Sequence, residues 1–402
     1  MPGDYLLFER RDTPAADGMT MDYHLGADAA DLRTLLRELI SAHIPAGFLG
    51  ACTNDPQDLA TTESFCKLLA ADGLLALAWP KEHGGGGGSV WQQTVLREEM
   101  WAHHEPRGAQ YMGINWVGPA LMRYGTAEQK QRHLSAIAAG EVIWCQGFSE
   151  PEAGTDLASL RTRAVADGSG WRVTGQKVWT SYAQMASWCV LAACTDPNAP
   201  KAKRLSLFLV PMDRPGITVR PIRSMLGPHH LNEVFLDDVE VSADEVLGEV
   251  GDGWRVMREA LAFERVGIAR YARCESLLDR VHSELGADWE RLPESIRTRW
   301  VRALIDLRVA RLLAYRAVSL QADPSAGAAA SAARIATTTC DQQVAELLFD
   351  VLGPSALDSG SSAALHGAIE DHWRYAQAAT VASGTIEVQR MLVAREALGG
   401  NG

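Results

Sequence analysis

The stretch Trp144–Asp156, which reads WCQGFSEPEAGTD, decides the fold of this chain. Pro151 ends regular secondary structure, and Gly154 lets the backbone approach a ligand closely. Ser149 and Thr155 place hydroxyl groups on either side of that turn. A turn with hydroxyls, acids and free N–H groups can bind a phosphate or the edge of a heteroaromatic ring. On its own, however, the stretch is also typical of an acidic surface loop.

A second stretch, Gln176–Tyr182 with the sequence QKVWTSY, favours a binding site. It follows a strand-like run at Trp171–Thr174, and Gly175 with Gln176 predicts a turn between the two. Trp179 offers an indole for stacking, and Ser181 offers a hydroxyl two residues further on. Together the two stretches are suited to a flat, polycyclic ligand.

Composition limits the classes of protein that remain. The chain has 402 residues, of which 47% are hydrophobic and 22% charged, and its formal net charge is −12. This acidic balance argues against a nucleic-acid partner. The seven cysteines form no C-x-x-C pair and no metal-ligand spacing, so no metal is expected. No signal peptide and no membrane-spanning run are visible, which favours a cytoplasmic protein without a membrane partner.

Three regions with different sequence patterns follow one another along the chain. Residues 1–140 show helical periodicity from Asp31 onward, residues 141–250 are short strands separated by turns, and residues 251–402 are helical again. We therefore expect an α+β protein with an N-terminal all-α domain, a middle β-barrel domain and a C-terminal helical bundle. The predicted elements used below are helices at Thr61–Asp72 and Trp254–Gly286, an N-cap at Thr126 and a strand at Trp188–Ala193.

FSEPEAGTD followed by GQKVWTS resembles the flavin-binding middle domain of the acyl-CoA dehydrogenases, and the resemblance extends from about Asp31 to Gly399. It implies a four-helix C-terminal bundle and FAD as cofactor. It also implies an activity: a carboxylate takes the α-proton of an acyl-CoA thioester while hydride leaves Cβ for the flavin. The family's site residues carry over to matching positions of this chain. The flavin contacts are Phe148, Ser149, Gly154, Thr155, Trp179, Ser181, Gly384, Thr385 and Gln389, with Thr155 also near the substrate.

The catalytic base needs a separate argument. Many members of the family have a glutamate just before the Gly-Thr of the C-terminal helix, but this chain has Ser383, a poor base. The backbone N–H of Ser383 can still donate to the thioester carbonyl of the substrate.

Some members place the base on the first helix after the β domain, where this chain has Glu264. An apolar stripe on this predicted helix would bury that carboxylate, which raises the pKa of a base that must remove a weakly acidic proton. A salt bridge to a neighbouring arginine is the other interpretation of Glu264. The adjacent Arg265 matches a position that contacts the CoA moiety. The stripe consists of Trp254, Met257, Leu261, Ile268 and Tyr271.

Two departures from the family concern its assembly. The segment that usually reads R-x-x-F-G and reaches the flavin of a twin subunit is Arg280–Gly286 here, without a phenylalanine. The family's Q-x-x-G-G element is degraded at Phe349–Pro354. These changes resemble the heteromeric acyl-CoA dehydrogenases of actinobacterial steroid side-chain degradation. We expect a homotetramer, or a heterotetramer with a related chain, and an electron-transferring flavoprotein as acceptor.

The leading hypothesis is therefore an FAD-dependent acyl-CoA dehydrogenase of lipid metabolism that forms the trans-2-enoyl-CoA and uses Glu264 as base. Two alternatives remain at this point. One is a flavin-dependent monooxygenase or oxidase on the same fold, which would need no base at Ser383. The other is a weakly active partner subunit in a heteromeric enzyme. The acyl group cannot be predicted from these motifs, because the shape of the pocket sets it.

Overall fold

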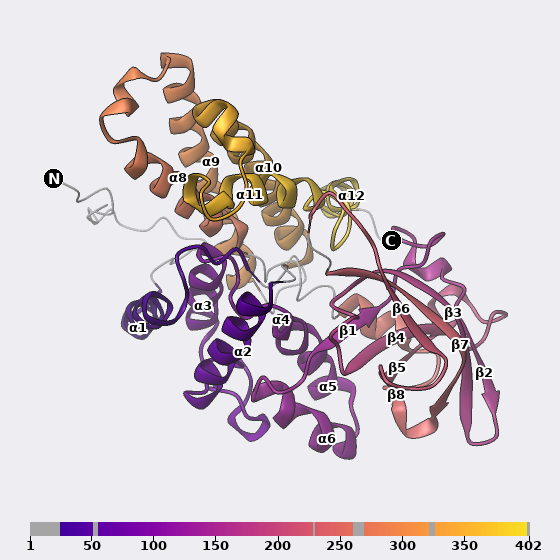
Figure 1. Ribbon diagram of the computed structural model, residues 1–402. Helices are drawn as coiled ribbons and strands as arrows, with labels where there is room; N and C mark the ends of the chain where they lie inside the picture. The colour runs from indigo at the N-terminus through magenta and orange to yellow at the C-terminus, as the bar shows by residue number, and fades with distance from the viewer. Residues whose placement is uncertain (1–24, 51–54, 228–229, 260–268, 321–325, 400–402) are drawn as a thin grey trace, which may run out of the picture.

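The chain folds into two helical parts and a sheet, as a computed structural model shows (Figure 1). In Figure 1 the N-terminal helices lie at the lower left, the sheet at the right and the C-terminal helices at the top. The α+β architecture expected from the sequence is confirmed. None of the helices in the described part of the chain is both long and apolar enough to cross a membrane. The structure describes residues 25–50, 55–227, 230–259, 269–320 and 326–399.

The N-terminal helices bury their apolar faces around one core. Two helices begin earlier than predicted, at Ala27 instead of Asp31 and at Pro56 instead of Thr61. The early start of the second helix follows from Asp55, whose side chain caps it by accepting from the N–H of Gln57. The predicted cap at Thr126 is confirmed, since its hydroxyl accepts from the N–H of Gln129 at 3.2 Å. The helices are α1 (Ala27–His43), α2 (Pro56–Ala71), α3 (Val90–Ala102), α4 (Gln110–Met112), a π-turn at Gly113–Val117, α5 (Gly118–Tyr124) and α6 (Ala127–Ala138).

The middle part is a single sheet of eight strands. Seven strands follow the order β6-β7-β3-β2-β4-β5-β8, and β1 pairs with β4 in parallel, so the described ladder has two ends, at β6 and β8. The predicted strand at Trp188–Ala193 is β4, a continuous apolar run because both of its faces are buried. The strands are β1 (Trp144–Gly147), β2 (Arg163–Asp167), β3 (Gly170–Ser181), β4 (Trp188–Cys194), β5 (Leu205–Pro211), β6 (Ile217–Pro221), β7 (Leu231–Ser242) and β8 (Val246–Leu247).

The predicted turn at Gly175 and Gln176 is wrong. Strand β3 continues through both residues to Ser181, with a register shift against β7 between Val173 and Gly175. A Cβ on Gly175 would lie 2.5 Å from Oγ1 of Thr162. The glycine is therefore required by the close approach of another backbone, and this use of glycine within a strand leaves the strand intact.

The C-terminal helices pack side by side around a second core. A helix begins at residue 253 and is described up to residue 259, while α8 begins at Arg270. Ala269, with φ −84° and ψ 52°, is not helical, so the predicted continuous helix Trp254–Gly286 is wrong. The helices are α8 (Arg270–Leu285), α9 (Glu294–Ser319), α10 (Ala326–Leu352), α11 (Ala368–Ala378) and α12 (Ile386–Ala397).

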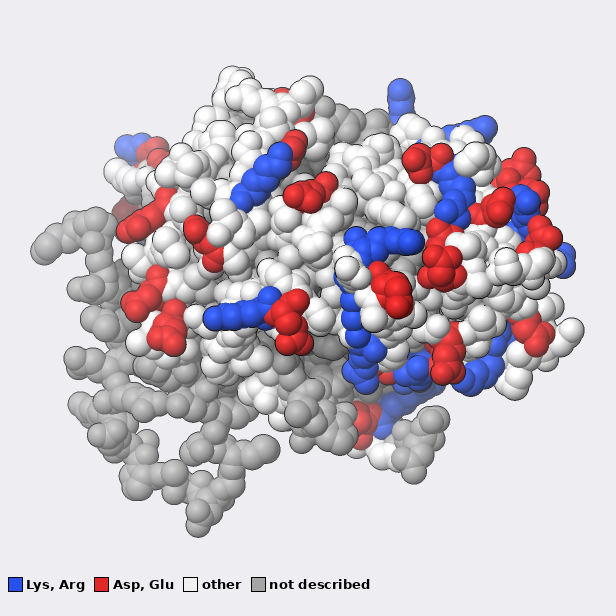
Figure 2. All heavy atoms as spheres, turned by 90° about the horizontal axis from the view of Figure 1, so that it is seen from below, with Lys and Arg blue, Asp and Glu red and all other residues white. Residues whose placement is uncertain are grey.

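Charged side chains are mixed on the surface. Figure 2 shows one face on which acidic and basic side chains lie next to each other, many of them in contact. The ion pairs between exposed side chains of this chain include Lys67 with Glu63 at 2.6 Å and Arg161 with Glu152 at 2.7 Å. This face presents no broad basic area of the kind that would attract a nucleic acid.

Candidate functional site

The structure brings the two motif stretches together at the sheet. Strand β1 leads into the loop that begins at Phe148, and the carbonyl of Ser149 accepts a hydrogen bond from the N–H of Val178 on β3 at 2.9 Å. The loop therefore lies directly beside the part of β3 that bears Trp179 and Ser181. Phe148 itself is buried in the core shared with the N-terminal helices.

A buried ion pair fixes this arrangement. The ammonium group of Lys177 donates to Oε1 of Glu150 at 2.7 Å and to the carbonyl of Phe148 at 3.3 Å. Glu150 also accepts from the backbone N–H groups of Arg161 at 2.6 Å and Thr162 at 2.8 Å. One carboxylate thus joins β3, the motif loop and the start of β2.

The pKa values of the pair follow from its burial. Burial lowers the pKa of Lys177 to about 8, although Glu150 favours the charged form of the lysine. Burial alone would raise the pKa of Glu150, but the charge of Lys177 and the N–H donors outweigh it and hold that pKa below its usual value. Both groups are therefore charged at neutral pH.

The backbone of Trp179 has a positive φ angle, which residues other than glycine rarely adopt. Its φ is 61°, it lies at the register shift between Lys177 and Thr180, and 56% of its surface is exposed. A large indole that is both strained and exposed is unfavourable in the free chain, and such strain is concentrated at functional sites. Ser181, two residues further, is half-buried at the end of β3.

The outer part of the motif loop is open. Gly154 and Thr155 are exposed, and a Cβ placed on Gly154 would have no heavy atom within 4 Å. The loop ends at Asp156, whose carboxylate accepts from Lys201 at 2.8 Å in an ion pair exposed to solvent. The space beside Gly154 can therefore admit a ligand without displacing protein atoms.

A second group of predicted residues forms the turn before α12. Ser383, with φ 58°, and Gly384, with φ 90°, lead into Thr385, whose hydroxyl caps α12 by accepting from the N–H of Val388. The guanidinium of Arg334 on α10 holds the preceding backbone by donating to the carbonyls of residues 379 and 382.

Gln389, on the first turns of α12, carries an unsatisfied acceptor. Its side chain is fully buried, its amide nitrogen lies 3.4 Å from the carbonyl of Gly384, and its Oε1 has no hydrogen-bond partner within the described structure. A buried acceptor without a donor is unfavourable unless a ligand supplies the donor.

The remaining two predicted residues, Glu264 and Arg265, lie outside the described residues. The helical stripe that placed Glu264 inward included Tyr271, but Ala269 interrupts the helix between them. The periodicity across that point therefore no longer supports the position of Glu264, and its role remains a prediction.

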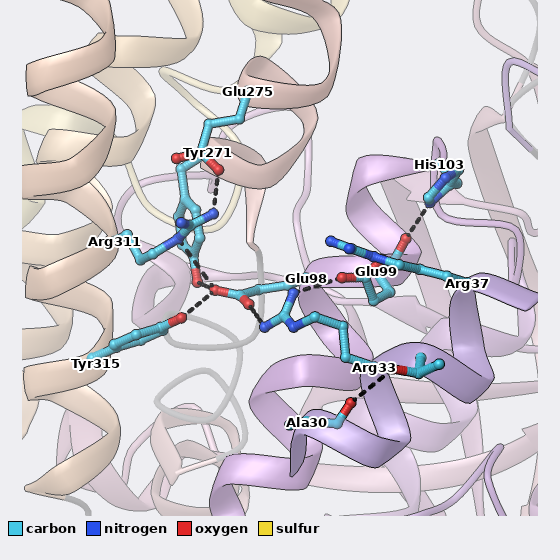
Figure 3. Close-up of polar contacts among 11 residues, drawn as sticks. Ala30, Arg33, Arg37, Glu98, Glu99, His103, Tyr271, Glu275, Arg311 and Tyr315 are labelled. Carbon is cyan, nitrogen blue, oxygen red and sulfur yellow. Dashed lines mark hydrogen bonds and ion pairs between the residues drawn. The ribbon is translucent and has the colours of Figure 1, made fainter. Parts of the chain in front are cut away.

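A buried glutamate joins the N-terminal helices to the bundle (Figure 3). Oε1 of Glu98 on α3 accepts from the phenols of Tyr271 on α8 at 2.9 Å and Tyr315 on α9 at 2.8 Å. Its other oxygen accepts from Arg33 on α1 at 2.5 Å, and Arg311 lies 3.5 Å from Oε1. Burial raises the pKa of both phenols, which therefore remain donors at any physiological pH. This contact fixes α8, which begins just after the segment with Glu264.

A separate polar cluster lies inside the bundle, where the polar side-chain atoms of Cys274, Asp341 and His372 lie within 4.8 Å of one another. Arg270 already donates to Asp341 at 3.0 Å, and the thiol of Cys274 lies 3.4 Å from the same carboxylate. Because an arginine balances the charge of the carboxylate, the cluster needs no cation.

The sequence argument missed the pairing of Glu150 with Lys177. The available signal was Val173, an apolar residue four positions before Lys177, because strand alternation places both side chains on the same side of β3. A buried lysine requires an acidic partner. Its partner is 27 residues away in sequence, a pairing that strand periodicity does not reveal.

Comparison with known proteins identifies the three parts. Residues 27–141, 145–239 and 251–398 match the family descriptions "Acyl-CoA dehydrogenase, N-terminal domain", "Acyl-CoA dehydrogenase, middle domain" and "Acyl-CoA dehydrogenase, C-terminal domain". Acyl-CoA dehydrogenase IpdE1 of Mycobacterium tuberculosis is 33% identical over 388 residues, which cover 92% of this chain and 98% of the relative.

Two solved structures are similar in both sequence and fold. "Tcur3481-Tcur3483 steroid ACAD" is 34% identical, with a TM-score of 0.87 over 94% of this chain and 99% of that chain. The ChsE4-ChsE5 complex from Mycobacterium tuberculosis contains a chain that is 33% identical, with a TM-score of 0.82 over 95% of this chain and 99% of that chain.

Proposed function

This chain belongs to the acyl-CoA dehydrogenase family and is an oxidoreductase that acts on CH–CH bonds; we propose that it oxidises the Cα–Cβ bond of an acyl-CoA thioester with FAD as cofactor and Glu264 as base. The observation that carries the proposal is the platform formed by the motif loop and β3. There the carbonyl of Ser149 accepts a hydrogen bond from the N–H of Val178, the adjacent indole of Trp179 is exposed, and a Cβ on Gly154 of the same loop would have no heavy atom within 4 Å.

The residues present fit FAD, the cofactor on which this family depends. Trp179 and Ser181 would contact the ring system, with Phe148, Ser149 and Thr155 along its edge. The buried Oε1 of Gln389 lacks a donor that a bound ligand would supply. FAD bound here would supply the acceptor for the hydride that leaves Cβ. Gly384 and Thr385 complete the proposed set.

The chain's own residues prepare the substrate. The backbone N–H of Ser383 donates to the thioester carbonyl, which makes the α-proton more acidic, and the carboxylate of Glu264 removes that proton. Thr155 contacts the substrate beside the flavin, and Arg265 binds the CoA moiety. The strained turn at Ser383 is held by Arg334, so the N–H group keeps its direction without any contribution from the serine side chain.

A related partner chain is part of the proposal. The names of the two solved structures described above each join two protein designations, Tcur3481-Tcur3483 and ChsE4-ChsE5. In this chain Arg280 and Ser283, from the segment that lacks the family's phenylalanine, line a surface pocket of about 650 Å³ together with residues 362–366. We propose a heterotetramer in which a related chain completes the flavin site, with an electron-transferring flavoprotein as acceptor. The alternative of a weakly active partner subunit is supported by the degraded cross-dimer elements at Arg280–Gly286 and Phe349–Pro354.

Glu264→Gln tests the assignment. The substitution keeps the shape of the side chain and removes its basicity, so we expect flavin to remain bound and its reduction by substrate to slow by roughly two to four orders of magnitude. Stopped-flow reduction under anaerobic conditions measures this. Glu259→Gln is the matched control, since Glu259 precedes it by five residues and forms an ion pair with Arg123 at 3.0 Å. If Glu264→Gln reduced its flavin as fast as this control, the base would lie elsewhere, in a partner chain or in a different chemistry.

A further inference from the structure

The long helix α9 has apolar side chains on two opposite faces. One face is buried in the bundle, where Trp300, Leu307 and Ala310 belong to the core. The opposite face is exposed to solvent, although an apolar residue recurs on it at steps of three or four positions. We refer to this exposed set as the α9 stripe. Its members, each between 46% and 56% exposed, are Val301, Ile305, Val309 and Leu312.

The α9 stripe forms a continuous apolar line on the surface. Apolar residues scattered singly over a surface need no explanation, but a contiguous exposed patch indicates an interaction site. A helix that is apolar on both faces is normally covered on both. At 1.5 Å per residue the stripe is about 17 Å long from Val301 to Leu312, or about three turns of helix. A second helix packed along α9 would cover it.

The charged side chains beside the α9 stripe are basic. Arg302 and Arg308 lie about 60° to either side of Ile305 around the helix axis, at 3.6 residues per turn. Arg316 lies beyond the C-terminal end of the stripe. All three arginines are exposed, and none of them forms an ion pair or a hydrogen bond with another described residue. The one exposed acid of α9 is Glu294, its first residue, so both edges of the stripe carry positive charge.

Acids on the neighbouring helices are engaged by other arginines of α9. Glu275 on α8 contacts Arg311, and Arg308 acts on that carboxylate only through space. Asp350 on α10 pairs with Arg299. No ion pair in the described structure therefore compensates the arginines beside the α9 stripe.

A second copy of this chain is a poor partner for this face. In a contact with two-fold symmetry the same surface of both subunits meets, so two antiparallel α9 helices would place each edge of the stripe beside the same edge of the copy. Arginine would then lie beside arginine, and like charges across an interface are unfavourable. In paired helices the charges beside an apolar seam decide the choice of partner in this way.

We propose that the α9 stripe binds a helix of a different, related chain, on which an apolar seam is bordered by acidic side chains. The inference rests on the hetero-oligomer proposed above and names the chemistry by which the partner is chosen. Burial of the stripe supplies affinity, and the arginines favour an acidic partner over a second copy. The contact is separate from the flavin platform, since α9 lies in the bundle at the top of Figure 1 and the sheet lies at the right.

The test uses the chain itself as the probe. Arg302→Glu, Arg308→Glu and Arg316→Glu are combined in one full-length variant, which keeps the α9 stripe and reverses the charge at its edges. Sedimentation velocity of the purified chains, one of them fluorescently labelled, measures their association singly and as a mixture. We expect wild type and variant to bind each other roughly tenfold or more tightly than either binds itself. This preference should weaken as NaCl is raised from about 0.05 M to about 0.5 M, because salt screens exposed charges.

Two controls separate the α9 stripe from the rest of the surface. Ile305→Asp in both chains should abolish the preference, because it places a charge within the apolar seam. A variant with Arg132→Glu, Arg163→Glu and Arg223→Glu has the same net charge as the probe but changes exposed arginines elsewhere, so it should show no preference for the wild type. Glutamine at the three arginines beside the stripe should remove the repulsion and let the chain associate with itself more tightly than the wild type does.

A mixture that binds no more tightly than the separate chains would overturn the inference, as would a preference that persists with Ile305→Asp. Self-association of the wild type that is lost in Ile305→Asp would also overturn it, because the occupant of the face would then be a second copy. None of these measurements needs a substrate. Reduction of the flavin by acyl-CoA tests the proposed dehydrogenation separately, so the failure of either proposal is recognised without the other.

Discussion

Lys177→Met removes the cation that holds the motif loop to the sheet. The ammonium group lies 2.7 Å from Glu150, and both side chains are buried, with 0% and 8% of their surfaces exposed. Methionine is similar in length to lysine and fits the same site, but it leaves the carboxylate of Glu150 without its counter-charge. We therefore expect the loop to lose its anchor while the apolar contacts of β3 remain.

The size of the effect follows from the contacts that Glu150 keeps. Removing one partner of a buried ion pair destabilises a protein by about 3–5 kcal/mol. The N–H groups of Arg161 and Thr162 still donate to Glu150, so we expect the lower end, about 3 kcal/mol. If flavin binding requires the ordered loop, the same free energy raises the Kd for FAD by roughly 100-fold.

Urea denaturation followed by tryptophan fluorescence measures the loss of stability, and titration of the apoprotein with FAD measures the loss of affinity. Lys201→Met is the matched control, because Lys201 pairs at 2.8 Å with Asp156 at the end of the same loop but is exposed. The control should change the free energy of unfolding by less than about 1 kcal/mol. Combining Lys177→Met with Glu150→Gln should recover part of the stability, since no buried charge remains and the amide oxygen can still accept from the backbone N–H groups that Glu150 binds.

Equal effects of Lys177→Met and Lys201→Met would refute this reasoning. So would a double variant whose loss of stability equals or exceeds the sum of the losses in the two single variants, because the lysine and the carboxylate would then not be coupled.

Two further substitutions test the contact of His133 on α6 with the tryptophans of the sheet and the strained backbone at Trp179. His133 on α6 lies between Trp144 and Trp188, and burial lowers its pKa to about 4. Between pH 6.5 and 4 the unfolded chain binds a proton at His133 that the folded chain does not, so the free energy of unfolding should fall by roughly 2 kcal/mol from pH 7 to pH 4.5. His133→Gln should remove that part of the fall in denaturation curves at the two pH values; an unchanged acid sensitivity would contradict the assignment. Trp179→Gly should raise the free energy of unfolding by about 1 kcal/mol, because glycine adopts a φ of 61° without strain, and should weaken FAD binding. A variant that is less stable than the wild type, or that binds FAD equally well, would contradict the functional account of that strain.

The parts of the fold that could be predicted depend on local patterns. Strand β4 is an apolar run bounded by polar residues, and Thr126 begins α6 with a capping box that is visible in the sequence. The joint presence of the motif loop and Trp179 was enough to place both at one site, and the structure brings them together through the hydrogen bond from Val178 to Ser149.

The parts that could not be predicted depend on contacts distant in sequence. Gly175 gives the same local signal in a turn as in a strand that another backbone approaches, and only the position of Thr162 separates the two. The break at Ala269 interrupts a pattern that is periodic on both sides of it.

The most direct test of the central claim is an anaerobic titration of the flavin-loaded protein with linear, branched and steroid-chain acyl-CoA thioesters. The visible absorbance of the oxidised flavin reports the reaction. The account predicts bleaching by at least one of these classes, complete at about one equivalent per flavin and slowed in Glu264→Gln. A flavin that stayed oxidised with every thioester but was reduced readily by a nicotinamide nucleotide would contradict it.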